Sequence, residues 1–292
     1  MRSRKIFNFS LLISFGLALL TGGYFLFTRG RPAPVPVKEE IMGGVTYLRI
    51  VRYLPHSMIA HILVIDTKGR KPQFMVTPPD DIDGGALKAR TTSQFLEEFG
   101  VQIAINGDGF FPWWSRSPVD YYPHVGDPVT PNGLTASYGD RYADGLQDAR
   151  PEPTLYISRR NELTFNNPPN KFFHALSGDR MLIEGGKIIS GLDDTEIDPR
   201  TAIGTNHNGR FIYLVVVDGR QPFYSEGATF AELAELLKDL GASYAMSLDG
   251  GGSSTMVIEG ANGKPVVLNS PIDNYIPMRE RPVANHFGVY IK

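Results

Sequence analysis

The most informative part of the sequence is Ser243-Tyr244-Ala245-Met246-Ser247-Leu248-Asp249-Gly250-Gly251-Gly252-Ser253-Ser254-Thr255-Met256-Val257-Ile258. Residues 243–248 and 255–258 are largely apolar, which predicts two buried strands. Asp249 ends the first strand, and the glycines after it permit backbone conformations that other residues avoid. Such a loop can present successive N–H groups to an anion, with serine hydroxyls as further donors. We therefore expect an anion site made of Asp249, Gly250, Gly251, Gly252, Ser253 and Ser254. The alternative is a tight glycine hairpin without a ligand.

Outward from this stretch, strand-like runs outnumber helices. Residues 45–76, 101–105, 201–204, 211–217 and 286–291 are rich in β-formers, and Asn208-Gly209 predicts a hairpin between two of them. Helices are predicted over 91–99 and 229–240, the second with a Thr229-x-x-Glu232 capping box. Residues 106–132 read as one long loop. The pattern predicts an α+β domain with a mixed β-sheet core and few helices.

Four other polar motifs flank predicted strands. Asn106-Gly107-Asp108-Gly109-Phe110-Phe111 offers hydrogen-bonding groups to a sugar and an aromatic wall. Arg200 stands at a strand entrance, and guanidinium groups suit phosphate oxygens. Asp218-Gly219-Arg220 follows a strand, and Glu280-Arg281-Pro282-Val283-Ala284-Asn285 precedes the last one. Each motif alone also fits a turn or a solvated arginine. If the strand ends converge, these groups share one cleft.

The N-terminal segment carries a different signal. Arg2, Arg4 and Lys5 precede the mostly apolar residues 6–27, which are long enough to cross a bilayer. No small-residue cleavage site follows them, so an uncleaved anchor is favoured over a cleaved signal peptide. We expect a signal-anchor segment at 1–29, a proline-rich linker at 30–40 and one extracytoplasmic domain at 41–292.

Composition excludes several classes of function. The formal net charge of -2 and the absence of a basic stripe argue against nucleic-acid binding. The chain has no cysteine, so disulfides, zinc–thiolate sites and thiol nucleophiles are excluded. The six histidines form no recognised zinc motif. Asp81-Ile82-Asp83-Gly84 resembles part of a calcium loop, but Pro79 occupies the first ligand position and Arg90 the twelfth, so an EF-hand is excluded. We expect no cofactor, and a looser divalent site is left open.

Taken together, the motifs resemble the phosphodiester glycosidase family. The resemblance covers residues from about 103 to the end of the chain, and its most specific element is the Asp-Gly-Gly-Gly-Ser-Ser stretch. One departure is an extra residue at Asp108-Gly109, where the family usually has Asn-Gly-Gly or Asn-Gly-Asn before two phenylalanines. The resemblance implies hydrolysis of a sugar-1-phosphodiester on an extracytoplasmic glycan. We assign catalysis to Asp249 or Asp218, as base or nucleophile, and the sequence does not rank the two. We assign substrate binding to Asn106, Gly107, Arg200, Arg220, Thr229, Gly250, Gly251, Gly252, Ser253, Ser254, Arg281 and Asn285.

Two other functions fit the same residues. A membrane-tethered module could bind anionic polysaccharide or cell-wall glycan through the same loop and aromatic wall. A metal-dependent phosphodiesterase would cut the P–O bond instead. Phosphate is a good leaving group, so a glycosidase here would depend on phosphate stabilisation and a carboxylate near the anomeric carbon more than on a strong general acid.

Overall fold

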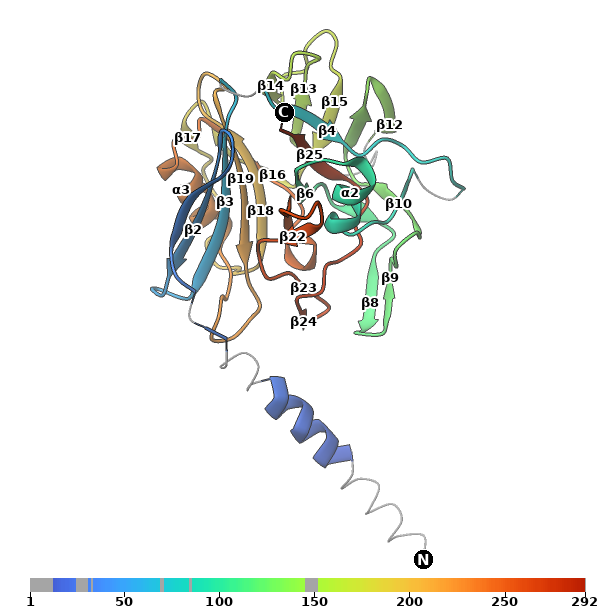
Figure 1. The fold of residues 1–292 in the computed structure, drawn as a ribbon, viewed down its shortest axis with the longest axis vertical. Coiled ribbons are helices and arrows are strands. Elements are labelled where there is room, and N and C mark those ends of the chain that lie inside the picture. The colour runs from blue at the N-terminus through green and yellow to red at the C-terminus, as the bar shows by residue number, and fades with distance from the viewer. Residues whose placement is uncertain are drawn as a thin grey trace, which may run out of the picture.

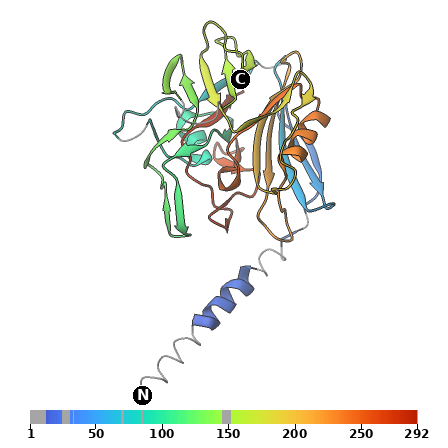
Figure 2. The same ribbon diagram turned by 180° about the vertical axis from the view of Figure 1, so that it is seen from behind.

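Antiparallel sheets build the fold (Figures 1 and 2). The structure is a computed structural model that describes residues 13–24, 31–32, 34–68, 71–83, 86–144 and 152–291. The largest sheet has eight strands in the order β1 (Val37–Met42), β2 (Val45–Arg52), β3 (Met58–Asp66), β19 (Phe211–Asp218), β18 (Arg200–Thr205), β20 (Tyr244–Ser247), β16 (Arg180–Glu184) and β17 (Lys187–Ile188). Its first strand begins inside the predicted linker.

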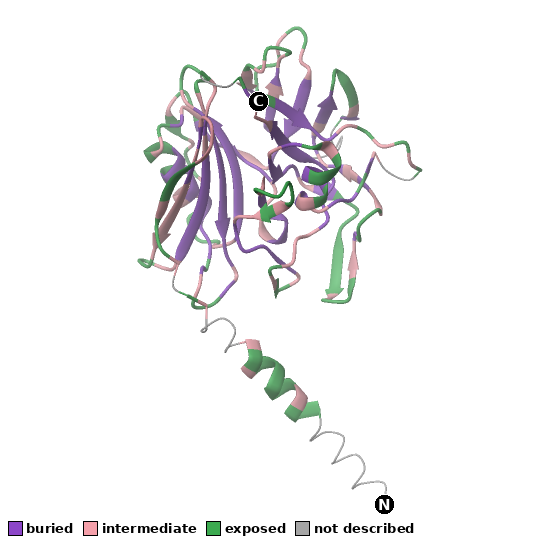
Figure 3. Ribbon diagram, viewed as in Figure 1, coloured by how far each residue is buried: buried purple, intermediate pink, exposed green. Residues whose placement is uncertain are grey.

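Two five-stranded sheets pack beside the large one. The first has the order β22 (Pro265–Val267), β21 (Met256–Glu259), β6 (Ile103–Asn106), β25 (His286–Tyr290) and β4 (Gln73–Val76). The second has the order β12 (Asp140–Asp144), β11 (Leu134–Ser137), β15 (His174–Ser177), β13 (Thr154–Ile157) and β14 (Leu163–Phe165). Their apolar faces and one face of the eight-stranded sheet enclose a shared core (Figure 3).

The remaining strands are short. They form a three-stranded sheet of β5 (Leu87–Lys88), β10 (Pro128–Pro131) and β7 (Phe110–Phe111), and the hairpins β8 (Trp114–Ser117) with β9 (Asp120–Tyr122) and β23 (Ile272–Asp273) with β24 (Ile276–Pro277). The region 106–132, predicted as one loop, therefore holds β7 to β10. Strands this short lack a hydrophobic period that a sequence pattern could reveal.

The predicted helices are confirmed. Helix α2 (Thr92–Phe99) is capped by Thr91 and ends at Gly100, whose φ of 64° is left-handed. Helix α3 (Phe230–Asp239) is capped by Thr229 with the predicted capping box to Glu232. The apolar side of α3 packs on the second face of the eight-stranded sheet. A short 3₁₀ turn, η1, covers Gly251–Ser253.

The prediction of few helices among many strands is confirmed, but the prediction of a mixed sheet is wrong. Every ladder between the strands named above is antiparallel, as in the hairpin that pairs Arg200 of β18 with Val217 of β19. Strand β20 pairs with β18, not with β19 that precedes it along the chain. Helix α3 therefore carries the chain over β18, and β19 and β20 do not pair directly with each other. Local sequence does not encode which strands become neighbours.

Residues 13–24 form a helix below the sheets in Figure 1. Among the residues that the structure describes, no helix is both long and apolar enough to cross a membrane. The predicted segment 6–27 extends at both ends into residues outside that description.

Candidate active site

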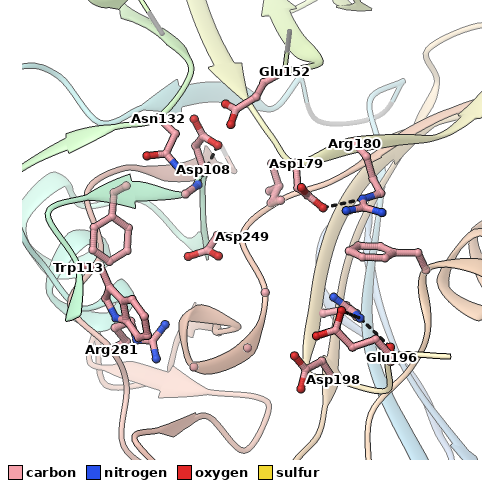
Figure 4. A pocket seen from close by; sticks show the side chains of 18 of the residues that line it. Asp108, Trp113, Asn132, Glu152, Asp179, Arg180, Glu196, Asp198, Asp249 and Arg281 are labelled. Carbon is pink, nitrogen blue, oxygen red and sulfur yellow. Dashed lines mark hydrogen bonds and ion pairs between the residues drawn. The ribbon is translucent and has the colours of Figure 1, made fainter. Parts of the chain in front are cut away.

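One pocket collects the ends of several strands. It has a volume of about 460 Å³ and lies where β6, β16, β18 and β20 end or begin. It is lined by Asp108, Gly109, Phe110, Trp113, Asn132, Glu152, Asp179, Arg180, Glu196, Asp198, Arg200, Arg220, Phe230, Leu248, Asp249, Gly250, Gly251, Gly252 and Arg281. Figure 4 shows Asp108, Asn132 and Glu152 along one side and Arg180, Glu196 and Asp198 across from them. The pocket therefore has an acidic wall and, opposite it, a wall that combines arginine with carboxylate side chains.

Asp108 is the most constrained group of the acidic wall. Its two carboxyl oxygens accept hydrogen bonds from the backbone N–H of Gly109 at 2.8 Å and of Gly133 at 2.7 Å. Burial raises the pKa of Asp108 well above the usual value, and the negative charge of Glu152 raises it further. Asp108 therefore retains a proton more readily than an aspartate exposed to water.

Asp249 points into the pocket between the two walls (Figure 4). Burial raises the pKa of this carboxyl above its ordinary value, while the Ser253 hydroxyl and the charge of Arg281 oppose the rise. Its backbone is fixed on both sides. The Asp249 N–H donates to Gly107 O at 2.9 Å, and its carbonyl accepts from Asn106 Nδ2 at 2.7 Å. A buried carboxylate held this firmly in a pocket has the features expected of a catalytic group.

Two arginines of the opposite wall share one aromatic ring. The guanidinium carbons of Arg180 and Arg200 each lie 3.9 Å from the centre of the Phe230 ring. Arg200 also donates to Ala228 O at 3.0 Å and Glu196 O at 2.7 Å, and Arg180 pairs with Asp179 at 2.7 Å. The ring and these acceptors hold both positive charges at the pocket surface.

Arg220 and Arg281 flank the glycine loop. Arg220 makes two hydrogen bonds of 2.8 Å to the carboxylate of Asp198. Arg281 donates to Asp273 at 2.8 Å and lies 5.0 Å from the centre of the Trp113 ring. Together with Arg180 and Arg200 they give the pocket four guanidinium groups, which suits it to a phosphate.

Three N–H groups of the predicted amide cradle are used within the protein. The N–H groups of Gly251, Ser253 and Ser254 donate to backbone carbonyls at 2.8, 3.2 and 3.3 Å, so they do not point at a ligand. The glycines serve close packing instead. A Cβ atom on Gly252 would lie 2.4 Å from Arg281 Nη2, and one on Gly251, whose φ is +58°, would lie 3.1 Å from Arg220 Nη2. The loop therefore leaves room for two arginines.

Several predicted binding residues lie behind the pocket wall. Asn106 is buried, and its Oδ1 accepts from Thr201 Oγ1 at 2.8 Å and from Thr255 N at 3.1 Å. Asn285 Oδ1 accepts from Asp108 N at 2.7 Å. The other predicted binding residues that do not line the pocket are Gly107, Ser253, Ser254 and Thr229. Thr229 caps helix α3. These residues position the wall and do not form its surface, because buried strand ends need their own polar groups satisfied.

Asp218 is placed differently from the sequence-based expectation. Its carboxylate is buried outside the pocket lining and contacts His61 Nε2 at 3.0 Å and Tyr224 Oη at 3.2 Å. It also accepts from Asn269 Nδ2 at 3.1 Å and Ser270 N at 2.7 Å. Asp218 and Asp249 therefore do not share the pocket surface. The side chain of Asp218 turns toward His61 of β3, and Tyr224, Asn269 and Ser270 supply its other three hydrogen bonds.

Asn269 links Asp218 to the glycine loop. Its Nδ2 donates to both Asp218 Oδ1 and Ser254 O, and its Oδ1 accepts from Met256 N at 2.9 Å. Asp218 thus supports the far end of the loop from behind.

The structure adds pocket residues that the motifs did not identify as site residues. These are Asp108, Trp113, Asn132, Glu152, Asp179, Arg180, Glu196, Asp198 and Phe230. Asp108 lay within a highlighted motif, and Asp179 follows a glycine after a buried strand, which is a usable signal. Glu152 has no local signal because only the tertiary fold brings it beside Asp108. Within the described ranges, no group of three or more His, Asp or Glu side chains is arranged to hold a metal ion.

Comparison with known proteins identifies the family to which the chain belongs. Residues 94–290 match the sequence model described as Phosphodiester glycosidase. The chain is 31% identical over 209 residues to N-acetylglucosamine-1-phosphodiester alpha-N-acetylglucosaminidase of Mus musculus, covering 64% of this chain and 38% of that protein. The protein of the same name from Homo sapiens is 29% identical over 254 residues, covering 78% of this chain and 45% of that protein. The chain thus spans less than half the length of these relatives.

Solved structures show the same fold. The zebrafish N-acetylglucosamine-1-phosphodiester alpha-N-acetylglucosaminidase catalytic domain, auto-inhibited by its pro-peptide, superposes with a TM-score of 0.59 at 21% identity, covering 89% of this chain and 85% of that one. A hypothetical protein from Synechocystis superposes with a TM-score of 0.59 at 14% identity, covering 89% of this chain and 64% of that one.

Proposed function

Because the chain belongs to the phosphodiester glycosidase family, we propose that it hydrolyses the glycosidic bond of a sugar-1-phosphodiester. The observation that carries the proposal is the pocket itself, where a buried carboxylate, Asp249, lies among four arginines, with Asp108, Asn132 and Glu152 along one side. A glycosyl phosphate needs those two parts, one for the sugar and one for the phosphate. The curated relatives are named for N-acetylglucosamine, which makes that sugar the first to test.

In the proposed reaction, water adds its oxygen to the anomeric carbon and the bond from that carbon to the phosphate oxygen breaks. The bonding electrons leave with the phosphate, which departs as a monoester. A proton of the water passes to Asp249 when it acts as base, or Asp249 attacks first and water releases the sugar in a second step. Because burial raises the pKa of Asp249, it is a stronger base than an exposed aspartate.

The arginines would stabilise the charge that grows on the departing phosphate. Arg180, Arg200, Arg220 and Arg281 come from separate segments and are held by their own acceptors before any ligand binds. Such preorganised charge acts without reorganisation at the moment of bond cleavage. The carboxyls of Asp108 and Glu152, with Asn132, supply hydrogen bonds to sugar hydroxyls.

The proposal also includes a location. Residues 6–27 would anchor the protein to a membrane, with the sheets on the extracytoplasmic side. The support is that the helix over 13–24 exposes large apolar side chains, including Phe15, Leu17, Leu19 and Leu20. A helix that is apolar on all sides needs a lipid or protein environment.

The test is hydrolysis of a methyl N-acetylglucosamine-1-phosphodiester by the full chain in water enriched in ¹⁸O. Label in the released sugar supports cleavage of the glycosidic bond. Label in the phosphate would overturn the proposal in favour of P–O cleavage. Absence of products across a panel of sugar-1-phosphodiesters, together with retained binding, would favour a non-catalytic glycan-binding module.

A further inference from the structure

Large apolar side chains are exposed together on four loops at one end of the molecule. The loops are 53–57 between β2 and β3, 219–229 between β19 and α3, 272–279 around β23 and β24, and 113–122 around β8 and β9. Their exposed apolar residues are Tyr53, Leu54, Trp113, Trp114, Val119, Phe223, Tyr275, Ile276 and Met278. We call this set the apolar rim. Figures 1 and 3 show β8, β9 and β24 at the lower end, the end from which the N-terminal helix extends.

Hydrogen bonds and a ring contact connect the four loops. Ser57 O accepts from Glu226 N at 2.8 Å, which ties loop 53–57 to loop 219–229. Arg279 Nη1 donates to Pro118 O at 2.9 Å, and its guanidinium lies 4.8 Å from the centre of the Tyr121 ring. Gln221 Nε2 donates to Ser270 O at 2.7 Å, and Ser270 Oγ donates to Met278 Sδ at 3.4 Å, which ties loop 219–229 to loop 272–279. The four loops are therefore connected to one another in the fold.

The rim also borders the pocket. Trp113 lines the pocket and stacks on Arg281, while the ring of Tyr275 lies 6.0 Å from the guanidinium of Arg220. Two arginines of the proposed phosphate site thus each contact a rim aromatic. A molecule that enters the pocket past these rings leaves its far end among apolar side chains.

The N-terminal chain is fastened to the same end. Arg31 donates to Gln221 Oε1 at 2.6 Å and to Ser270 Oγ at 2.9 Å, and it lies 4.5 Å from the centre of the Tyr224 ring. Seven Cα steps separate Arg31 from Tyr24 at the end of the apolar helix, so that end lies within about 25 Å of this anchorage. An anchor in a bilayer would therefore keep the rim close to the lipid surface.

We propose that the apolar rim docks on the surface of a lipid bilayer, and that the substrate is a glycosyl phosphodiester whose alcohol is a membrane lipid. The proposal rests on the proposed function and names its substrate class. Tryptophan and tyrosine favour the membrane–water interface, and contiguous exposed apolar surface marks an interaction site. Docking would bring the arginines of the pocket to the depth of lipid phosphates, with the sugar inside and the lipid outside.

The two tryptophans of the chain, Trp113 and Trp114, both belong to the rim and provide a built-in probe. The full chain is reconstituted through its N-terminal segment into vesicles that contain brominated phosphatidylcholine, and tryptophan fluorescence is compared with that in unbrominated vesicles. Docking predicts quenching by the bromine. Unquenched tryptophan in the anchored protein would overturn the proposal.

Two matched triple variants locate the contact. Leu54→Asp, Phe223→Asp and Met278→Asp change three rim residues outside the pocket lining, and aspartate tolerates the positive φ of the last two. The control carries Tyr138→Asp, Ile188→Asp and Val266→Asp, which are exposed apolar residues outside the rim. Quenching should be lost in the rim variant and kept in the control. Equal quenching in both variants would overturn the proposal. It would also be overturned if the wild-type protein formed concentration-dependent dimers that the rim variant abolished and the control variant did not, because the rim would then be a dimer interface.

Activity then separates this inference from the proposed function. On a lipid-borne sugar-1-phosphodiester in the same vesicles, the rim variant should be slower than the control variant on the order of tenfold, because docking raises the effective substrate concentration. On the water-soluble methyl diester the two should be equal. Equal rates on the lipid-borne substrate would overturn the lipid inference alone. Failure to cleave the soluble diester would instead contradict the proposed function.

Discussion

Gly252 packs against Arg281 so closely that a Cβ atom on the glycine would lie 2.4 Å from Nη2 and 2.7 Å from Cζ of the guanidinium. Arg281 is held on its other side by Asp273, so it has little room to retreat. The glycine loop therefore leaves the space that the Arg281 guanidinium occupies. This relationship determines the first prediction.

Gly252→Ala is expected to lower kcat/KM on the order of tenfold or more, because the new methyl group displaces the Arg281 guanidinium that stabilises the transition state. Steady-state kinetics on the methyl diester measure the effect. In combination with Arg281→Ala, the glycine substitution should add little further loss, since both changes remove the same contact. Fully additive losses would contradict this account.

Asp249→Asn should lower kcat on the order of a hundredfold or more, because the amide cannot act as base or nucleophile. The control is Asp144→Asn, the same chemical change on exposed β12, which should leave kcat unchanged. Circular dichroism of both variants checks that the fold is retained. An Asp249→Asn variant with near-full activity would remove this residue from the reaction.

The same carboxyl makes a prediction about stability and pH. Because burial raises the pKa of Asp249 above 3.8, the folded state binds this proton more tightly than the unfolded state. Its contribution to the free energy of unfolding is fully present below the unfolded pKa and is lost as pH rises through the folded pKa. Asp249→Asn should therefore gain stability relative to wild type as pH rises through that window. Urea denaturation of both proteins across this range measures the difference, and a constant difference would contradict the prediction.

Asp218→Asn is expected to lower the free energy of unfolding by about 3 kcal/mol, because it breaks a buried pair with His61. Because an asparagine amide has only one oxygen, the two donors at one of the two carboxylate oxygens would also lose their acceptor. Urea denaturation reports the loss. The kcat of the protein that remains folded should fall much less than in Asp249→Asn. A comparable fall in kcat with unchanged stability would restore Asp218 as a catalytic residue.

Phe230→Leu should raise KM on the order of tenfold with a smaller change in kcat, because the ring that supports Arg180 and Arg200 is lost. Phe211→Leu is the matched control, since Arg210 lies 4.8 Å from that ring outside the pocket. Unchanged KM in Phe230→Leu would show that the arginines keep their positions without the ring.

Much of the site was readable from sequence because its motifs sit at strand ends. Arg200, Arg220, Asp249, the three glycines and Arg281 all line the pocket as the motifs predicted. The burial pattern of a strand is local, and so is the turn chemistry that follows it. The sequence also identified both helices, the second of them through its capping box.

Only the packing of distant segments determines which polar groups face the pocket. Asp218 and Asp249 each follow an apolar strand, yet the first turns toward His61 and the second into the pocket. Glu152, Asp179 and Arg180 enter the pocket from segments with no shared motif. The local sequence determines where a strand ends, because side-chain burial and backbone freedom are properties of neighbouring residues. The direction in which the side chain at that strand end points depends on strands that are far away in the sequence. Only the packing of those strands determines whether the side chain is buried or faces the pocket.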